Sequence, residues 1–150
     1  MTHAPAPRPA IYPSPSIWST TIGYRVVGIG RDFCEIELDA DDRHTNALGV
    51  LHGGVVMAML DDVGGLSGRI REPGEAERRV ATVDFQTQFI QPVAKGLVRV
   101  IGRIVGGGKS IYFVRGELYG NGDVLCAAST STHRWRSAES FHREGKSPTP

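Results

Sequence analysis

The segment that most constrains this chain runs from Asn46 to Asp61 and reads NALGVLHGGVVMAMLD. A polar loop leads through Gly53 and Gly54 into an apolar run, which predicts a helix that starts at the glycine pair. Glycine N–H groups at a helix N-terminus attract a negative oxygen, as in an oxyanion hole. Asp61 follows about 12 Å further along the axis at roughly 1.5 Å per residue, too far to act on the same atom. A second subunit running antiparallel would close the gap, so the segment predicts a site shared between two chains.

The predicted helix has two unlike faces at about 100° per residue. One is a mostly apolar stripe that should pack on a core: Val56, Leu60, Val63, Ser67 and Ile70, flanked by Met59 and Leu66. The other consists of small residues around one acid: Gly54, Ala58, Asp61, Gly65 and Gly68. Glycine inside a helix costs about 1 kcal/mol against alanine, which favours a close approach by another backbone or a ligand on this face. Asp62 points toward the edge of the apolar stripe, so Asp61 is the stronger catalytic candidate.

The rest of the chain predicts a single α+β domain over residues 17–136. Residues 1–16 are Pro-rich and predict a disordered or extended leader, and the polar residues 137–150 predict a flexible tail. Alternating or apolar runs separated by turn residues predict an antiparallel sheet of about six strands wrapped on one long helix. The expected strands are 24–29, 33–38, 81–89, 97–105, 110–119 and 124–135, with an Asn-Gly turn at Asn121 and Gly122.

Charge and composition argue against several classes of function. The net charge of +1 comes from 17 Lys and Arg scattered among 16 acids, without the basic stripe expected of a nucleic-acid binder. No apolar run approaches the roughly 20 residues that cross a membrane. The two cysteines, Cys34 and Cys126, suit reduced and buried positions, and no histidines are spaced for a metal site. We therefore expect a cytoplasmic protein without nucleic-acid, membrane or metal partners.

The helix-start segment resembles the hotdog-fold acyl-CoA thioesterases, in the branch of the phenylacetate-pathway thioesterase and the mammalian thioesterase-superfamily member 2. The pattern N-x-x-G-x-x-H-G-G followed by an acid is filled here by Asn46, Gly49, His52, Gly53, Gly54 and Asp61. Residues 82–96 resemble that family's strand ending in Pro and Gly, and residues 108–135 resemble its final hairpin. The resemblance implies the hotdog fold, which agrees with the architecture that periodicity predicts.

The resemblance also implies hydrolysis of an acyl-CoA to a free acid and coenzyme A, with no cofactor because coenzyme A is part of the substrate. The Gly53 N–H would bind the thioester oxygen, and Asp61 of a second subunit would act as nucleophile or as general base on water. Asn46 would orient the water or the acid, although a turn residue is the alternative interpretation. Supporting positions are Thr82, near the water, together with His52 and Gly54 at the helix start; His52 is expected to hydrogen-bond the loop ahead of the helix.

Other assignments are less specific. Lys109, Ser110 and Arg134 lie at or near positions that the family uses for the coenzyme A nucleotide. His44 and His133 are expected to be surface or strand residues. A homodimer, or a dimer of dimers, follows from the shared site. Two alternative functions are a hotdog hydratase or dehydratase acting on acyl thioesters, and a non-catalytic acyl-CoA-binding module, which would have no need of Asp61.

Overall fold

A computed structural model of the chain describes residues 16–69 and 78–136. The elements follow in the order α1 (Ile17–Ile22), β1 (Arg25–Gly30), β2 (Phe33–Ala40), the 3-10 helix η1 (Asp42–His44), α2 (Gly53–Ser67), β3 (Arg79–Phe89), β4 (Gly96–Gly107), β5 (Ile111–Gly120) and β6 (Val124–Arg136). Apart from Ser16, the predicted leader lies outside the described residues, as do the predicted tail and Ile70.

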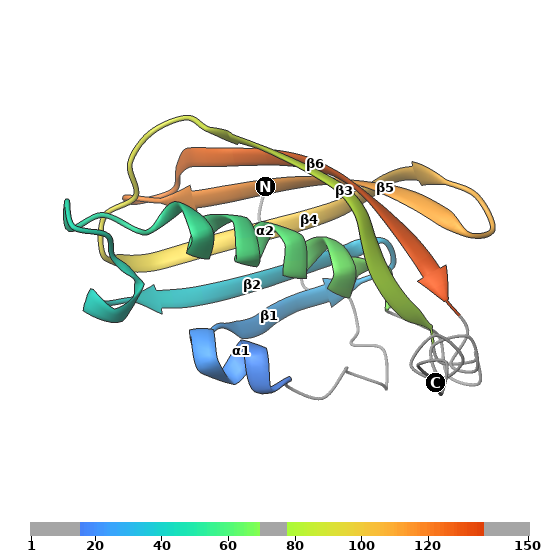
Figure 1. The fold of residues 1–150 in the computed structure, drawn as a ribbon, viewed down its shortest axis with the longest axis horizontal. Helices are drawn as coiled ribbons and strands as arrows, with labels where there is room; N and C mark the ends of the chain where they lie inside the picture. The colour runs from blue at the N-terminus through green and yellow to red at the C-terminus, as the bar shows by residue number, and fades with distance from the viewer. Residues whose placement is uncertain (1–15, 70–77, 137–150) are drawn as a thin grey trace, which may run out of the picture.

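The six strands form one antiparallel sheet in the order β1-β2-β4-β5-β6-β3. Helix α2 lies across one face of this sheet, and the short α1 lies beside β1 (Figure 1). The order leaves β1 and β3 as the two edges, so the strand that follows α2 in sequence ends up unpaired on one side. The predicted α+β architecture, with one long helix on about six strands, is confirmed.

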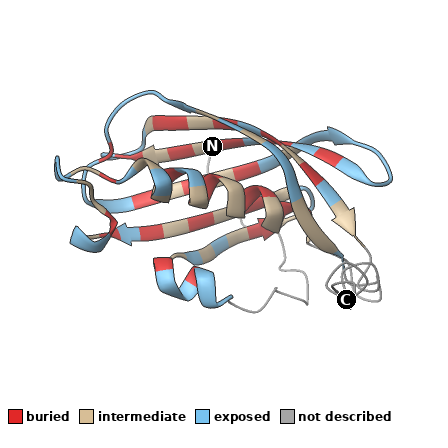
Figure 2. Cartoon of the chain, viewed as in Figure 1, coloured by how far each residue is buried: buried red, intermediate tan, exposed pale blue. Residues whose placement is uncertain are grey.

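Helix α2 is held on the sheet by the apolar stripe that its sequence predicts. Val56, Met59, Leu60, Val63 and Ser67 are buried, and they meet inward-facing residues of the strands (Figure 2). Fully burying an aliphatic side chain of this size contributes about 1.5–3 kcal/mol, so these residues fix which side of α2 faces the sheet. The orientation of α2 in turn determines where Asp61 points.

The small-residue face of α2 differs from the expectation at its C-terminal end. Gly68, the C-cap, is buried against the hydroxyl of Tyr112 with no room for a Cβ. Gly64, which lies outside the predicted small-residue face, is also buried: a Cβ there would lie 2.6 Å from Nε2 of His133. Gly65 has no neighbouring atom within 4 Å of its Cβ position. Close approach does explain the glycines at this end of α2. What approaches Gly64 and Gly68, however, is a side chain of the protein's own sheet, and not another backbone or a ligand.

Two short helices were not predicted, because capping side chains form them and neither is long enough for a periodic pattern. The hydroxyl of Ser16 accepts the N–H of Ser19 at 3.0 Å to begin α1, which ends at Gly23 with φ of 90°. Asp41 and His44 form a capping box around η1. His44 is buried, with Nε2 2.7 Å from the carbonyl oxygen of Ile22. The expectation that His44 is a surface or strand residue is therefore wrong.

Candidate active site

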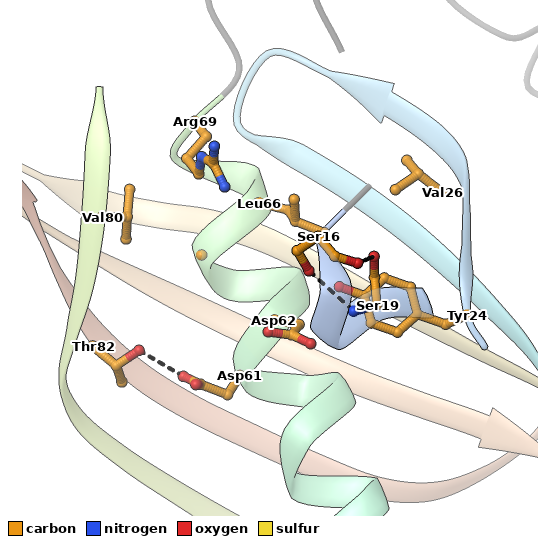
Figure 3. Close-up of a pocket in the computed structure, with 11 residues that line it drawn as sticks. Ser16, Ser19, Tyr24, Val26, Asp61, Asp62, Leu66, Arg69, Val80 and Thr82 are labelled. Atoms are coloured by element: carbon orange, nitrogen blue, oxygen red, sulfur yellow. Dashed lines mark hydrogen bonds between the residues drawn. The ribbon is translucent and has the colours of Figure 1, made fainter. Parts of the chain in front are cut away.

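Asp61 lies midway along α2 and points toward β3. The hydroxyl of Thr82 donates to Oδ1 of Asp61 at 2.8 Å (Figure 3). Both residues line a cavity of about 250 Å³ that is bounded by α1, β1, α2 and β3. Tyr24, Leu66 and Val80 add apolar surface to this cavity, and Arg69 adds a positive charge. The acid singled out by the sequence thus lies beside a hollow with mixed polar and apolar walls.

Asp62 lines the same cavity but points away from Asp61, toward α1 and Tyr24 (Figure 3). Burial raises the pKa of Asp62 to about 6; the hydrogen bond with Tyr24 works against this rise, and the charge of Asp61 adds to it. Its Oδ2 has no hydrogen-bond partner among the described residues. Burial likewise raises the pKa of the facing Tyr24 hydroxyl. The pair forms the buried side of the cavity, whereas Asp61 faces β3.

At the start of α2, the N–H groups of Gly53 and Gly54 differ in their hydrogen bonding. His52 is the N-cap, and its Nδ1 accepts the N–H of Gly54 at 2.9 Å. From the sequence, the His52 side chain is expected to hydrogen-bond the loop ahead of the helix. In the structure it caps the first turn of α2 instead, and its ring nitrogen takes the place of the usual Ser or Asp oxygen. Val55 and Val56 donate to the carbonyl of His52. In the described part of the chain, the Gly53 N–H is left without an acceptor.

Asn46 lies in the loop before α2 and forms a turn. Its Oδ1 accepts the N–H of Leu48 at 2.9 Å, its carbonyl accepts the N–H of Gly49, and its own N–H donates to Val50. This is the turn interpretation of Asn46, although the left-handed conformation falls on Gly49, with φ of 76°. No hydrogen bond joins Asn46 to Asp61 within the described residues of one chain. Its side-chain N–H₂ group has no acceptor among those residues, so it is available to another molecule.

The three residues assigned to coenzyme A come together at one end of the sheet. Lys109 and Ser110 are exposed in the β4–β5 turn. Arg134 is exposed on β6 in register with Ile111, and the N–H of Trp135 donates to the carbonyl of Ser110 at 2.9 Å. Because side chains alternate along a strand, Arg134 faces the opposite side of the sheet from its buried neighbour His133. This cluster therefore does not reach the Asp61 side of the sheet within one chain.

The sequence predicts a surface or strand position for His133. It does lie on β6, but it is fully buried and is not a surface residue. Its Nδ1 is 3.5 Å from the Thr82 hydroxyl, and Tyr112 stacks on its ring with centroids 5.2 Å apart. The sequence indicates only part of this placement. Ser129, Ser131 and His133 alternate with Thr130, Thr132 and Arg134, so the two sets face opposite sides of the sheet, and the structure turns the first set inward.

Gly53 and Asp61 lie beside opposite halves of β3, because α2 and β3 run antiparallel (Figure 1). At the N-terminus of α2, a Cβ on Gly53 would lie 3.4 Å from the ring of Phe89, the last residue of β3. Two turns later Asp61 bonds Thr82, near the beginning of β3. Both candidate groups of α2 thus lie against the free edge strand of the sheet, Gly53 near the end of β3 and Asp61 near its beginning.

The described residues contain no group of three or more His, Cys, Asp or Glu side chains arranged to hold a metal ion. No helix among them has the length and apolar character needed to cross a membrane.

The comparisons agree with this architecture. The sequence profile of the thioesterase superfamily matches residues 48–127, more than half of the chain and a range that includes Gly53, Asp61 and Thr82. A provisionally named esterase of Thermoplasma volcanium is 40% identical over 84 residues, which are 56% of this chain and 61% of that protein. The chain thus spans less than two thirds of this relative's length.

Among solved structures, a thioesterase from Haemophilus influenzae has a TM-score of 0.72 and 26% identity over 80% of this chain and 82% of its own. A provisionally named thioesterase of Ralstonia eutropha, described as related to phenylacetic acid degradation, has a TM-score of 0.68 and 30% identity over 86% of this chain and 92% of its own. The fold is the hotdog fold of these proteins. The chain belongs to the thioesterase superfamily, a family of thioester hydrolases.

Proposed function

We propose that this protein hydrolyses acyl-CoA thioesters to a free acid and coenzyme A at a site built by two copies of the chain. Gly53 of one subunit would supply the oxyanion donor, and Asp61 of the other would supply the reacting carboxylate. The observation that carries the proposal is that an unpaired N–H at the start of α2 and a carboxylate beside a cavity both lie against β3, the free edge strand of the sheet. Membership of the thioesterase superfamily supports the reaction class.

The geometry of β3 supports a dimer that completes the site. Gly53 lies against Phe89 and Asp61 bonds Thr82, so the two groups mark opposite ends of this edge strand. If two β3 strands pair antiparallel about an axis between Phe85 and Gln86, Thr82 of one chain faces Phe89 of the other. Asp61 of each subunit is then brought to Gly53 of its partner, twice in the dimer. The exposed apolar side chains of Val83, Phe89 and Ile90 along this edge would be covered by such pairing.

The chemistry needs few groups. The Gly53 N–H would polarise the thioester carbonyl, where one such donor typically lowers the barrier by about 3–4 kcal/mol. Asp61 would attack the carbonyl carbon to form an anhydride and release the coenzyme A thiolate, after which water cleaves the anhydride. Alternatively, Asp61 would take a proton from water, which attacks directly and expels the thiolate. Both routes use the same carboxylate and the same oxyanion donor.

Coenzyme A would contact the exposed cluster of Lys109, Ser110 and Arg134. Cations and N–H donors of this kind pair with phosphate oxygens. The cluster lies on the face of the sheet opposite Asp61, so it would have to serve the Asp61 site by a path around the sheet or in another subunit. The acyl group would occupy the cavity beside Asp61.

The test is an assay of coenzyme A release with a thiol reagent, over a panel of aromatic and straight-chain acyl-CoA thioesters. Activity on at least one member is expected, and it should be lost in Asp61→Asn and largely retained in Asp62→Asn. Absence of release from every thioester by a folded protein would contradict the proposal and leave an acyl-CoA-binding role, which binding of a non-hydrolysable thioether analogue would reveal.

A further inference from the structure

Four polar side chains form a line from the surface of the cavity into the core. Thr82 donates to Oδ1 of Asp61 at 2.8 Å, and the same hydroxyl oxygen lies 3.5 Å from Nδ1 of His133. On the far side of the ring, Nε2 of His133 is 2.8 Å from the hydroxyl oxygen of Ser131. The line joins α2 to β3 and β3 to β6, where Thr82 and His133 are register partners.

Hydrogen counting fixes the direction of the Thr82–Asp61 bond and assigns one tautomer of His133 that satisfies the other two contacts. A threonine hydroxyl has one hydrogen, and Thr82 gives it to a carboxylate that can only accept. Toward Nδ1 of His133 the oxygen of Thr82 can therefore only accept, so the 3.5 Å contact is a hydrogen bond in the tautomer whose Nδ1 carries the hydrogen. In a neutral imidazole Nε2 is then the acceptor, and it receives the hydrogen of Ser131. Ser131, His133 and Thr82 thus all donate toward Asp61.

The ring of His133 has little freedom to leave this arrangement. It is fully buried, it stacks on Tyr112 with an interplanar angle of 17°, and its Nε2 lies 2.6 Å from the position that a Cβ on Gly64 would take. Tyr112 is itself held by stacking on Trp135 and by donating its hydroxyl to the carbonyl of Gly64 at 3.2 Å. Burial lowers the pKa of His133 and so favours the neutral ring, although the charge of Asp61 opposes this.

We propose that His133 is a positioning residue for the thioesterase reaction, which holds the Thr82 hydroxyl so that it donates to Oδ1 of Asp61 and leaves Oδ2 to react. This inference rests on the proposed function. His133 is not itself a catalytic residue, because no atom of its ring is exposed to substrate. Asp61 makes no other hydrogen bond among the described residues, so Thr82 is what distinguishes its two oxygens.

The tautomer of His133 tests the geometry without any substrate. In the full-length protein, nitrogen-15 NMR of the histidine rings should show His133 as a neutral ring protonated at Nδ1. Ser131→Ala should disturb that resonance pattern. Ser129→Ala is the matched control, because Ser129 is buried on the same strand and its hydroxyl has no partner among the described residues. A ring protonated at Nε2, or at both nitrogens, at neutral pH overturns the proposal.

Kinetics of two amide variants test the positioning role. His133→Asn keeps an N–H near the position of Nδ1, whereas His133→Gln moves the amide toward Nε2. We expect His133→Asn to keep kcat within about threefold of wild type and His133→Gln to lower kcat about tenfold, with KM little changed, the scale of one lost hydrogen bond. In a Thr82→Val background the two variants should no longer differ, because the group they position is gone.

The outcomes separate this proposal from the proposed function. If the wild-type protein hydrolyses no thioester, the function fails, while the tautomer experiment still decides whether His133 is oriented toward Thr82. If the protein hydrolyses thioesters but His133→Asn and His133→Gln lose activity equally, His133 only fills space and the proposal is overturned. Thermal melts of each variant accompany the assays, and should His133→Gln fail to fold, the comparison of Ser131→Ala with Ser129→Ala replaces it.

Discussion

Thr82 on β3 donates its hydroxyl hydrogen to Oδ1 of Asp61 on α2, across 2.8 Å at the free edge of the sheet. The bond ties the helix acid to the strand that lacks a neighbour on its other side. A carboxylate fixed in this way keeps one oxygen occupied and presents the other, which is the state that either route of thioester hydrolysis requires.

Asp61→Asn should lower kcat by at least about 10²-fold, because the amide keeps the shape of the side chain but can neither attack nor take a proton. The measurement is coenzyme A release at saturating substrate. Asp62→Asn is the control: it changes the neighbouring carboxyl, which points away from β3 (Figure 3). Equal losses in the two variants would move the reaction away from Asp61.

Gly64→Ala and Gly65→Ala form a matched pair in the last turn of α2. Alanine at 64 would place its Cβ 2.6 Å from Nε2 of His133, so the ring or the helix must move and the free energy of unfolding should fall. Alanine at 65 meets no atom within 4 Å and should raise the free energy of unfolding by about 0.5–1 kcal/mol through helix propensity. Urea denaturation measures both, and a Gly64→Ala protein as stable as Gly65→Ala would show that His133 is not packed on Gly64.

Asp62 should make the protein less stable as the pH rises. Its pKa is raised from 3.8 to about 6 by burial, so the folded state binds its proton more tightly than the unfolded state. The stability that this proton contributes is complete below about pH 4 and is lost as the pH rises through about 6. Asp62→Asn does not titrate at this position. The free energy of unfolding of Asp62→Asn minus that of wild type should therefore increase between about pH 4 and about pH 6, and should stay constant at higher pH. A difference that does not change with pH would show that the carboxyl is hydrated.

The sequence predicted best those features that depend on local pattern. The buried stripe of α2 and the turn at Asn121 and Gly122 follow from periodicity and turn chemistry, and both are found. Helix α1 was missed because its boundaries come from a Ser16 cap and a left-handed Gly23, and six residues show no helical period.

The candidate site was predictable in its residues but not in its hydrogen bonds. The motif places Gly53 and Gly54 at the start of α2, but only the capping geometry of His52 reveals that the Gly54 N–H is already used. Similarly, the sequence motif and the family resemblance point to Asp61 and Thr82. Their contact, however, depends on the order of the strands in the sheet, which places β3 at the edge beside β6. Alternation along β6 places His133 on the face opposite Arg134, but both faces are polar around it, so the burial of His133 depends on tertiary packing.

Charge introduced at the free edge should dissociate the proposed dimer. Val83 is 59% exposed on β3, where a paired second strand would cover it, so Val83→Lys should shift the protein from dimer to monomer in sedimentation and abolish turnover. Val105→Lys is the control, because Val105 is 66% exposed near the end of β4, away from the β3 edge. A monomer that is fully active at nanomolar concentration would contradict the shared site.

Mixed dimers test directly whether Gly53 and Asp61 act across the interface. Gly53→Pro removes the N–H proposed as oxyanion donor, and proline is tolerated at the first position of a helix. A heterodimer of one Gly53→Pro chain and one Asp61→Asn chain has one site with both defects and one with neither. Mixing and re-annealing the two inactive homodimers should therefore restore about half of the wild-type activity per heterodimer. If each site lies within one chain, both sites of the heterodimer are defective, so folded and verified heterodimers that stay inactive would reject the cross-subunit arrangement.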